Sequence, residues 1–251
     1  MRTIHLAVAL TVAFLLNFNY PARAADASGG TGKIRVLVVT GGHDFEKEPF
    51  FQVFKDNPEI EYQAVEQPAA QESFKVEAAK NYDVLVFYDM HQEITDEGKS
   101  NLLARLKDGK GLVVLHHAIA DYQTWPEYAK IIGAKYYLAP TVVDGVAKKR
   151  SAYKHGMHFT LHVVDPNNPV TKGMKDYEIL DETYKWFDVA NDVHPLLTTE
   201  EPESNHVVAW AKTYSNARVV YMQSGHDHFA YENPNFQKVL KQAIEWTARR
   251  N

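Results

Sequence analysis

Short, nearly continuous apolar runs alternate with helical segments in the first half of the chain, and this alternation constrains the fold more than any other feature. The apolar runs are residues 33–40, 61–65, 83–88 and 111–116. The helices are expected at residues 49–56, 71–80 and 96–106, the last with Thr95 as its N-cap. Runs rich in β-branched residues are typical of strands covered on both faces. Strands that alternate with helices form βαβ units, so the sequence predicts an α/β fold around a mainly parallel central sheet.

The second half is richer in strand patterns. Strands are expected at residues 159–164, 177–186, 206–214 and 218–222. A closing helix is expected at 235–249, where apolar residues recur at helical spacing after Pro234. We find no internal repeat and no break in composition after Thr31, so residues 33–251 are expected to form one domain.

The first 24 residues have the composition of a secretory signal peptide. Arg2 gives a positive start, residues 4–18 are mostly apolar, and Ala22-Arg23-Ala24 forms a small-x-small cleavage pattern. The apolar run is short for a helix that spans a membrane. Residues 25–32 are small and polar and are expected to form a flexible lead-in. The sequence therefore predicts an exported protein, periplasmic in a host with two membranes, with no membrane contact after cleavage.

Composition excludes several classes of function. The chain has no cysteine, which removes disulfides, thiolate metal sites and cysteine nucleophiles. Without residues 1–24 it carries 25 basic and 32 acidic residues, a net charge of −7, and no basic stripe, so nucleic acid is not an expected partner. The pair Gly41-Gly42 is followed by neither a GxGxxG nor a GK[ST] pattern, so no nucleotide cofactor is expected.

Histidines gather where the expected parallel strands end. Eleven of the 227 residues after residue 24 are histidine. The residues of interest that follow four of the strands are Gly42, His43 and Asp44; Asp89 and His91; His116, His117 and Asp121; and Gln223, Ser224, His226, Asp227 and His228. A single histidine at a strand end is more often structural than functional. Ligands of open α/β sheets bind at the carboxyl ends of the strands, however, so four such ends together favour one shared polar site.

The segment from Gly109 to Ala118 gives the sharpest single signal. A buried strand delivers His116 and His117 into a tight strand-to-helix turn. This geometry resembles a nucleophile elbow, in which serine or cysteine normally stands. An imidazole there can act as acid, base or metal ligand, and the alternative is a histidine packed in the turn.

Two further patterns concern the second half. In Asp181-Glu182-Thr183-Tyr184, strand alternation places Glu182 and Tyr184 on one face, where they can act together. The alternative is a solvated strand edge. His155, His158 and His162 have helical spacing, but the segment has strand character, so a metal site built from all three is not expected.

Several motifs in order resemble the trehalose-utilisation (ThuA-like) family. They are TGGHDF (40–45), DVLVFYD (83–89), GLVVLHHAIADYQTWPEYAKIIGAKY (111–136), HVVDPNNPVTKGM (162–174), DETY (181–184) and VAWAKTYSNARVVYMQSGHD (208–227). The resemblance covers about residues 33–248. It implies a flavodoxin-like three-layer sandwich similar to class I glutamine amidotransferases. The absence of cysteine excludes glutaminase chemistry by their route.

The resemblance also implies a carbohydrate substrate: a disaccharide, a glycoside or a 3-keto-glycoside. We expect a hydrolase, lyase or isomerase that uses acid–base chemistry, with or without a divalent metal such as zinc. The expected catalytic residues are His116, His117, Glu182 and His226, of which His116, Glu182 and His226 are the expected metal ligands. The expected substrate-binding residues are Gly42, His43, Asp44, Asp89, Tyr184 and Trp125. A sugar-binding protein without catalytic activity is the alternative, and it would need aromatic stacking but no titratable centre.

Overall fold

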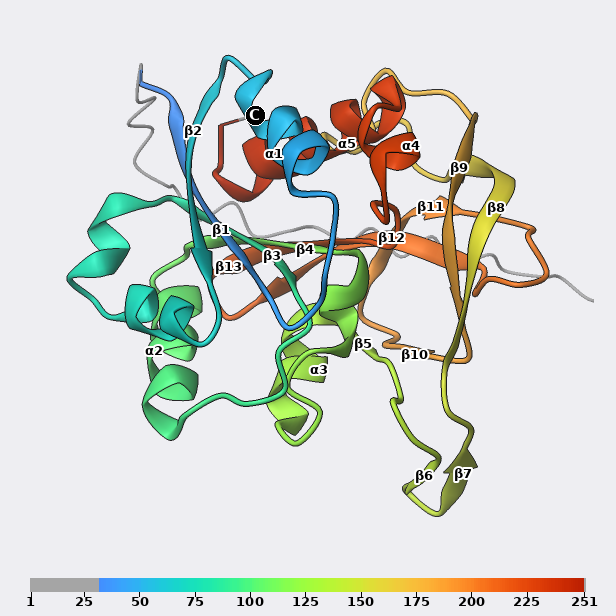
Figure 1. Ribbon diagram of the computed structural model, residues 1–251, viewed down its shortest axis with the longest axis horizontal. Helices are drawn as coiled ribbons and strands as arrows, with labels where there is room; N and C mark the ends of the chain where they lie inside the picture. Colours follow the sequence, from blue (N-terminus) through green and yellow to red (C-terminus); the bar gives the residue numbers. More distant parts are fainter. Residues whose placement is uncertain (1–31, 251) are drawn as a thin grey trace, which may run out of the picture. The chain divides into compact units, whose positions relative to one another are not determined.

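A computed structural model describes residues 32–250, so the expected signal peptide and most of the expected lead-in lie outside the described residues. A nine-stranded sheet runs through the domain (Figure 1). Its strands, in spatial order, are β2 (Ile60–Glu66), β1 (Ile34–Gly41), β3 (Val84–Asp89), β4 (Gly111–Leu115), β13 (Ala217–Met222), β12 (Val207–Tyr214), β11 (His194–Thr198), β8 (Ala152–Val163) and β9 (Tyr177–Lys185). Two small antiparallel pairs accompany it, β5 (Ala134–Lys135) with β10 (Asp188–Val189) and β6 (Thr141–Val143) with β7 (Val146–Lys148).

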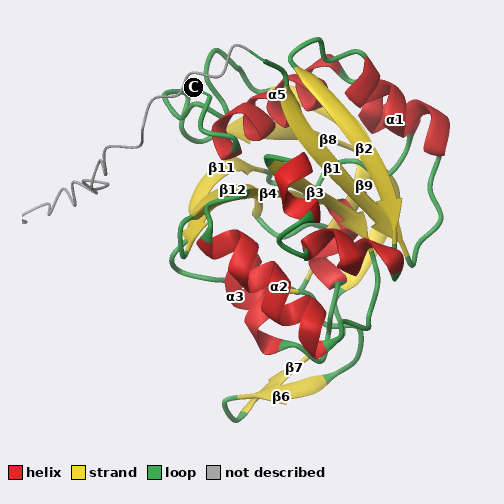
Figure 2. Cartoon of the chain, turned by 90° about the vertical axis from the view of Figure 1, so that its left-hand side faces the viewer, coloured by secondary structure: helices red, strands yellow, loops and turns green. Residues whose placement is uncertain are grey.

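Helices cover both faces of the sheet, which makes the domain a three-layer α/β sandwich, as the sequence predicted (Figures 1 and 2). One face carries α1 (Lys47–Lys55), α4 (His228–Tyr231) and α5 (Pro234–Thr247). The other carries α2 (Asp96–Lys107), α3 (Pro126–Ile132) and the 3₁₀ helices η1 (Ala69–Phe74), η2 (Ala78–Asn81) and η3 (His116–Ala120). The expected cap is present, since Thr95 Oγ1 accepts a hydrogen bond from the Gly98 N–H at 2.9 Å.

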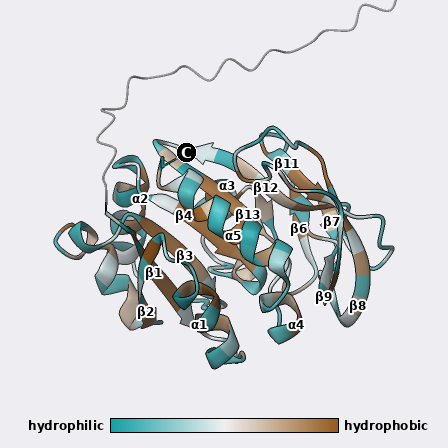
Figure 3. Ribbon diagram, turned by 90° about the horizontal axis from the view of Figure 1, so that it is seen from above, coloured by the Kyte–Doolittle hydropathy of each residue, from teal (hydrophilic) through white to brown (hydrophobic). Residues whose placement is uncertain are grey.

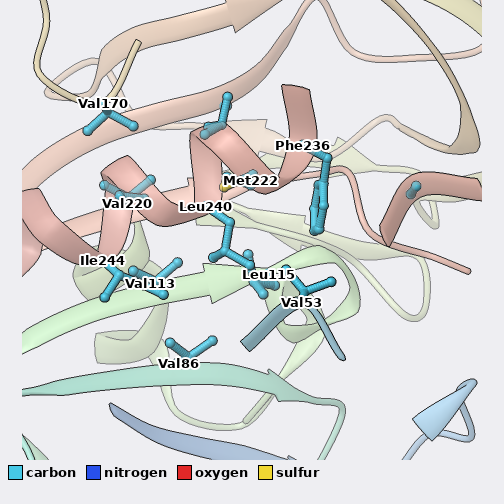
Figure 4. Close-up of a cluster of buried hydrophobic side chains, with 14 of the residues drawn as sticks. Val53, Val86, Val113, Leu115, Val170, Val220, Met222, Phe236, Leu240 and Ile244 are labelled. Carbon is cyan, nitrogen blue, oxygen red and sulfur yellow. The ribbon is translucent and has the colours of Figure 1, made fainter. Parts of the chain in front are cut away.

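Strand alternation divides the core into two halves. Along β4, Val113 and Leu115 point to the α5 face, whereas Leu112 and Val114 point to the α2 face. Side chains of α5 and of the central strands interlock on the first face (Figure 4). The central strands are hydrophobic along their length (Figure 3), as expected for strands covered on both sides.

The sheet is mixed, which differs from the mainly parallel sheet that we predicted. The pairs β2–β1, β1–β3, β3–β4 and β4–β13 are parallel, but every pair from β13 to β9 is antiparallel. The reason lies in the connections. Only Ser215 and Asn216 join β12 to β13, and so short a link reverses the chain, whereas a parallel pair needs a long crossover.

The predicted helix at residues 71–80 is also wrong, because two separate 3₁₀ turns, η1 and η2, occupy this segment. Phe74 and Ala79 are both buried against the same face of the sheet. Residues five apart cannot share one face of an α-helix, and a break between two short turns allows both to reach the core. Within residues 32–250, no helix has the length and apolarity needed to cross a membrane.

Candidate functional site

His116 stands at the sharp turn where β4 ends and η3 begins. Its φ angle is 51°, in the left-handed region that residues other than glycine rarely adopt. Strained positions of this kind often mark functional sites. The ring is almost fully buried. The structure thus places a histidine at the elbow that the sequence indicated.

The hydrogen bonds of His116 fix which ring nitrogen carries the proton. Nδ1 lies 2.7 Å from the carbonyl oxygen of Gln223, and a carbonyl only accepts, so Nδ1 donates. Burial lowers the pKa of His116 well below its usual value, and the neighbouring His117 adds to this effect. The ring is therefore neutral near pH 7, and Nε2 presents a free lone pair.

Three side chains surround that lone pair. His116 Nε2 lies 2.8 Å from the Tyr184 hydroxyl, 3.3 Å from His226 Nδ1 and 3.6 Å from Glu182 Oε1. His116 belongs to the β4–η3 turn, Glu182 and Tyr184 to β9, and His226 to the loop between β13 and α4. We call these four residues the polar centre. Glu182 and Tyr184 share a face, as strand alternation predicted.

Glu182 is the carboxylate of the polar centre. Burial raises its pKa to about 7, a hydrogen bond with Tyr184 opposes the shift, and the charges of Asp181 and Asp227 add to it. Oε2 lies 3.6 Å from His226 Nδ1 and 2.5 Å from His155 Nδ1. Both carboxylate oxygens therefore face imidazole nitrogens.

His155 is a neighbour of the polar centre that the sequence pattern did not indicate. It lies on β8 next to a bulge, and its ring centroid is 4.6 Å from that of His226. His158 and His162 turn elsewhere, to Glu178 and Asp176. The three histidines therefore face three different carboxylates. Strand alternation could have separated His155 from His158, but only the β8–β9 register brings His155 to Glu182.

Asp181 precedes Glu182 on β9, and its hydrogen bonds fix the positions of two residues of the polar centre. Its buried carboxylate accepts backbone hydrogen bonds from Glu182 at 2.8 Å, Gly225 at 2.8 Å and His226 at 3.0 Å. These bonds join β9 to the loop that carries His226. Because Glu182 and His226 come from segments far apart in the sequence, Asp181 fixes their relative position.

We expect Asp181→Asn to lower the free energy of unfolding by about 1–3 kcal/mol. Both oxygens of Asp181 accept backbone hydrogen bonds in the wild type, and in the variant the amide NH₂ takes the place of one of them and cannot accept. Chemical denaturation would measure the change. The matched control is Thr183→Val on the same strand: Thr183 Oγ1 is buried and has no hydrogen-bond partner among residues 32–250. That variant should change stability by less than about 1 kcal/mol. Equal losses in the two variants would contradict the role of Asp181.

The other expected site residues lie around the polar centre at different depths. His117 is buried; its Nε2 is 3.3 Å from the Tyr88 carbonyl, and burial, with the charge of His43, lowers its pKa to about 3. His43 is exposed and stacks on His117 with ring centroids 4.5 Å apart. His117 in turn lies 5.3 Å from His116, so His43, His116 and His226 converge as expected. Gly42 and Asp44 are exposed beside His43.

Asp89 and Trp125 have other partners than the residues of the polar centre. Asp89 is fully buried and pairs with the carboxyl of Asp121 and the amide of Gln67. Trp125 is 9% exposed and packs in the core against Tyr122 and Tyr128. Both side chains are buried among these partners, and their expected role in substrate binding stays a prediction.

Comparisons with known proteins agree with this architecture. A family model described as "Trehalose utilisation" (ThuA) matches residues 35–247. A ThuA-like protein from Parabacteroides merdae superposes with a TM-score of 0.73 at 19% identity, over 86% of this chain and 90% of its own. A second, from Bacteroides uniformis, gives 0.65 at 19% identity, over 91% and 95%. A cytoplasmic protein of Salmonella typhimurium gives 0.61 at 12% identity, over 85% and 99%. No curated protein sequence matches the chain.

Proposed function

Because the chain belongs to the trehalose-utilisation (ThuA) family, we propose that it is an exported enzyme that acts on a disaccharide, a glycoside or a 3-keto-glycoside. The observation that carries the proposal is the polar centre. Two imidazoles, a carboxyl and a phenol from three separate segments meet within hydrogen-bonding or ion-pair distance. A protein that only binds sugar needs no such concentration of titratable groups.

The proposed reaction follows from the protons that the groups of the polar centre can take from the substrate and give to it. The ketone of a 3-keto-glycoside acidifies the neighbouring C2–H bond. A base of the polar centre takes that proton, the electron pair forms a C1–C2 double bond, and the C1–O bond to the leaving group breaks. An acid of the centre then gives a proton to the departing oxygen. The step is an elimination without net oxidation, and one acid and one base suffice for it.

The surroundings of the polar centre suit a sugar. Tyr153 is 55% exposed and lies 5.1 Å, between ring centroids, from His155. The β8–β9 register pairs Tyr153 with Tyr184, so the exposed ring stands on the face that carries Glu182. An aromatic face beside several hydrogen-bonding groups is the usual composition of a sugar site. We propose that Tyr153 stacks against the substrate and that His43 and Asp44 bind its hydroxyl groups.

Export rests on the sequence of residues 1–24 alone. The positive start, the apolar run and the Ala22-Arg23-Ala24 pattern support cleavage before Ala25. Cysteine is absent from the chain, so an exported product would carry no disulfide. The intact mass of the protein isolated from its host would test this, and an unprocessed Met1 would contradict it.

A substrate screen tests the function. The protein from Ala25 onward would be incubated with trehalose, other disaccharides and their 3-keto derivatives, and the products followed by mass spectrometry. We expect turnover of at least one keto-sugar, and loss of that turnover in Glu182→Gln. Saturable sugar binding without any product would favour the binding-protein alternative and overturn the enzymatic proposal.

A further inference from the structure

We propose that His116 Nε2, the Glu182 carboxylate and His226 Nδ1 form a binding site for one divalent first-row cation, of the zinc type. One donor atom from each residue lies within 4.8 Å of the other two. The proposal rests on the proposed function only for the place where substrate binds. The cation itself is measured without any sugar.

The shortest separations between the three side chains match those of a tetrahedral site. Zinc binds imidazole nitrogen and carboxylate oxygen at about 2.0–2.2 Å, so neighbouring ligand atoms of a tetrahedron lie about 3.3–3.6 Å apart. The shortest separations here are 3.3 Å between the two histidine nitrogens and 3.6 Å from Glu182 to each of them. Glu182 turns a different oxygen toward each histidine, so one shared oxygen requires a rotation of the carboxylate.

The hydrogen bonds around the donors also leave a lone pair available for a cation. His116 gives its Nδ1 proton to the Gln223 carbonyl, which leaves Nε2 free and sets the ring's orientation. Histidine ligands of metals in proteins almost always have such an outer partner on the second nitrogen. Tyr184 reaches both His116 Nε2 and Glu182, so its hydroxyl can turn to the carboxylate when Nε2 binds the cation. Asp181 holds the backbones of Glu182 and His226 in place.

Burial differs between the donors in a way that fits an entry path. The side chains of His116 and Glu182 are 1% and 6% exposed, whereas that of His226 is 24% exposed. A cation would therefore enter beside His226 and bind the two deeper residues. Three protein ligands leave one tetrahedral position open, the pattern of catalytic zinc sites. When bound there, a cation polarises a carbonyl or hydroxyl oxygen of the substrate.

The experiment is a titration of the chelator-treated protein with Zn²⁺ by calorimetry, repeated with Co²⁺, whose visible absorption is strong when the ion is four-coordinate. We expect one ion per chain and a tetrahedral cobalt spectrum. In Glu182→Gln and in His226→Ala the affinity should fall by more than 100-fold, beyond the roughly 10–100-fold that loss of an outer partner produces.

Matched controls separate a ligand from any surface group. Glu178→Gln on the same strand and His158→Ala on β8 remove exposed side chains of the same types, and they should bind like the wild type. Circular dichroism without metal would verify that each variant folds. Absence of stoichiometric binding, or equal binding in the ligand and control variants, would overturn the cation site. Sugar turnover by the metal-free protein would overturn a role for the cation in turnover but leave the proposed function standing. Zinc binding without turnover of any sugar would overturn the proposed function but leave the cation site standing.

Discussion

Glutamine in place of Glu182 should reduce turnover of the sugar substrate by about 10²–10⁴-fold, the range expected when a group that transfers protons is removed. Glutamine keeps the volume of the buried side chain but neither takes up a proton nor carries a charge. The remaining contacts of the polar centre, from Tyr184 to His116 and from Asp181 to the backbone, do not involve the Glu182 carboxylate. The measurement is kcat and KM on the substrate that the screen identifies.

The control for this prediction is Glu178→Gln. Glu178 lies on the same strand, 70% exposed in its side chain and near His158 rather than the polar centre. Its variant should keep wild-type turnover. A fall of the same size in both variants would point to a general effect on β9. Wild-type turnover in Glu182→Gln would show that Glu182 is not one of the groups that transfer protons. His116 and His226 would then be the remaining candidates for proton transfer.

The first half of the fold could be predicted because its signals are local. Each parallel strand is an apolar run bounded by turn residues, and the strand-end rule then places the residues that follow at one edge. His116 and His226 meet for this reason: β4 and β13 are adjacent parallel strands, His116 follows directly after β4, and His226 lies in the loop that follows β13. Strand alternation alone was enough to put Glu182 and Tyr184 on one face.

What the sequence did not reveal depends on pairing between distant strands. His155 reaches Glu182 only through the β8–β9 register and a bulge after Lys154, and nothing within β8 encodes its partner. Asp181 stands on the face opposite Glu182, so its role depends on the path of the Gly225–His226 backbone. Trp125 was a reasonable candidate for sugar stacking by residue type, but the α3 side of the core encloses it. Residue type predicts chemistry, and burial decides whether the chemistry is accessible.

The buried carboxyl pair Asp89–Asp121 should make stability depend on pH. Burial raises the pKa of Asp89 to about 7, and burial together with the charge of Asp89 raises that of Asp121 well above its usual value. Asp89 Oδ1 has no hydrogen-bond donor in the described chain unless one of the two carboxyls is protonated. We therefore expect the pair to share a proton in the native state. In the unfolded chain an aspartate has a pKa of about 3.9, so the folded protein binds this proton more tightly.

A group whose pKa is raised by folding contributes stability that is complete below the unfolded pKa and is lost as the pH rises through the folded pKa. The wild type should therefore lose stability between about pH 4 and pH 7, and Asp181 and Glu182, whose pKa values are also raised, add to this trend. Asp89→Asn removes the Asp89 contribution. The asparagine oxygen still accepts from Gln67, and its NH₂ donates to an ionised Asp121, which replaces the shared proton.

We therefore expect Asp89→Asn to gain stability relative to the wild type on the order of 1–3 kcal/mol between pH 5 and pH 8. Urea denaturation at pH 5, 6.5 and 8 would measure this difference.

Asp83→Asn is the matched control. Asp83 pairs with Arg35 at 2.6 Å, and its bonds to Arg35 hold its pKa below the usual value against the opposing effect of burial. It stays ionised throughout this range, so its variant should differ from the wild type by a constant amount. Parallel curves for the wild type and Asp89→Asn would mean that the two carboxyls do not share a proton. A relative gain confined to Asp89→Asn would establish that this buried acid pair, which is separate from the polar centre, makes the fold lose stability as the pH rises toward 7.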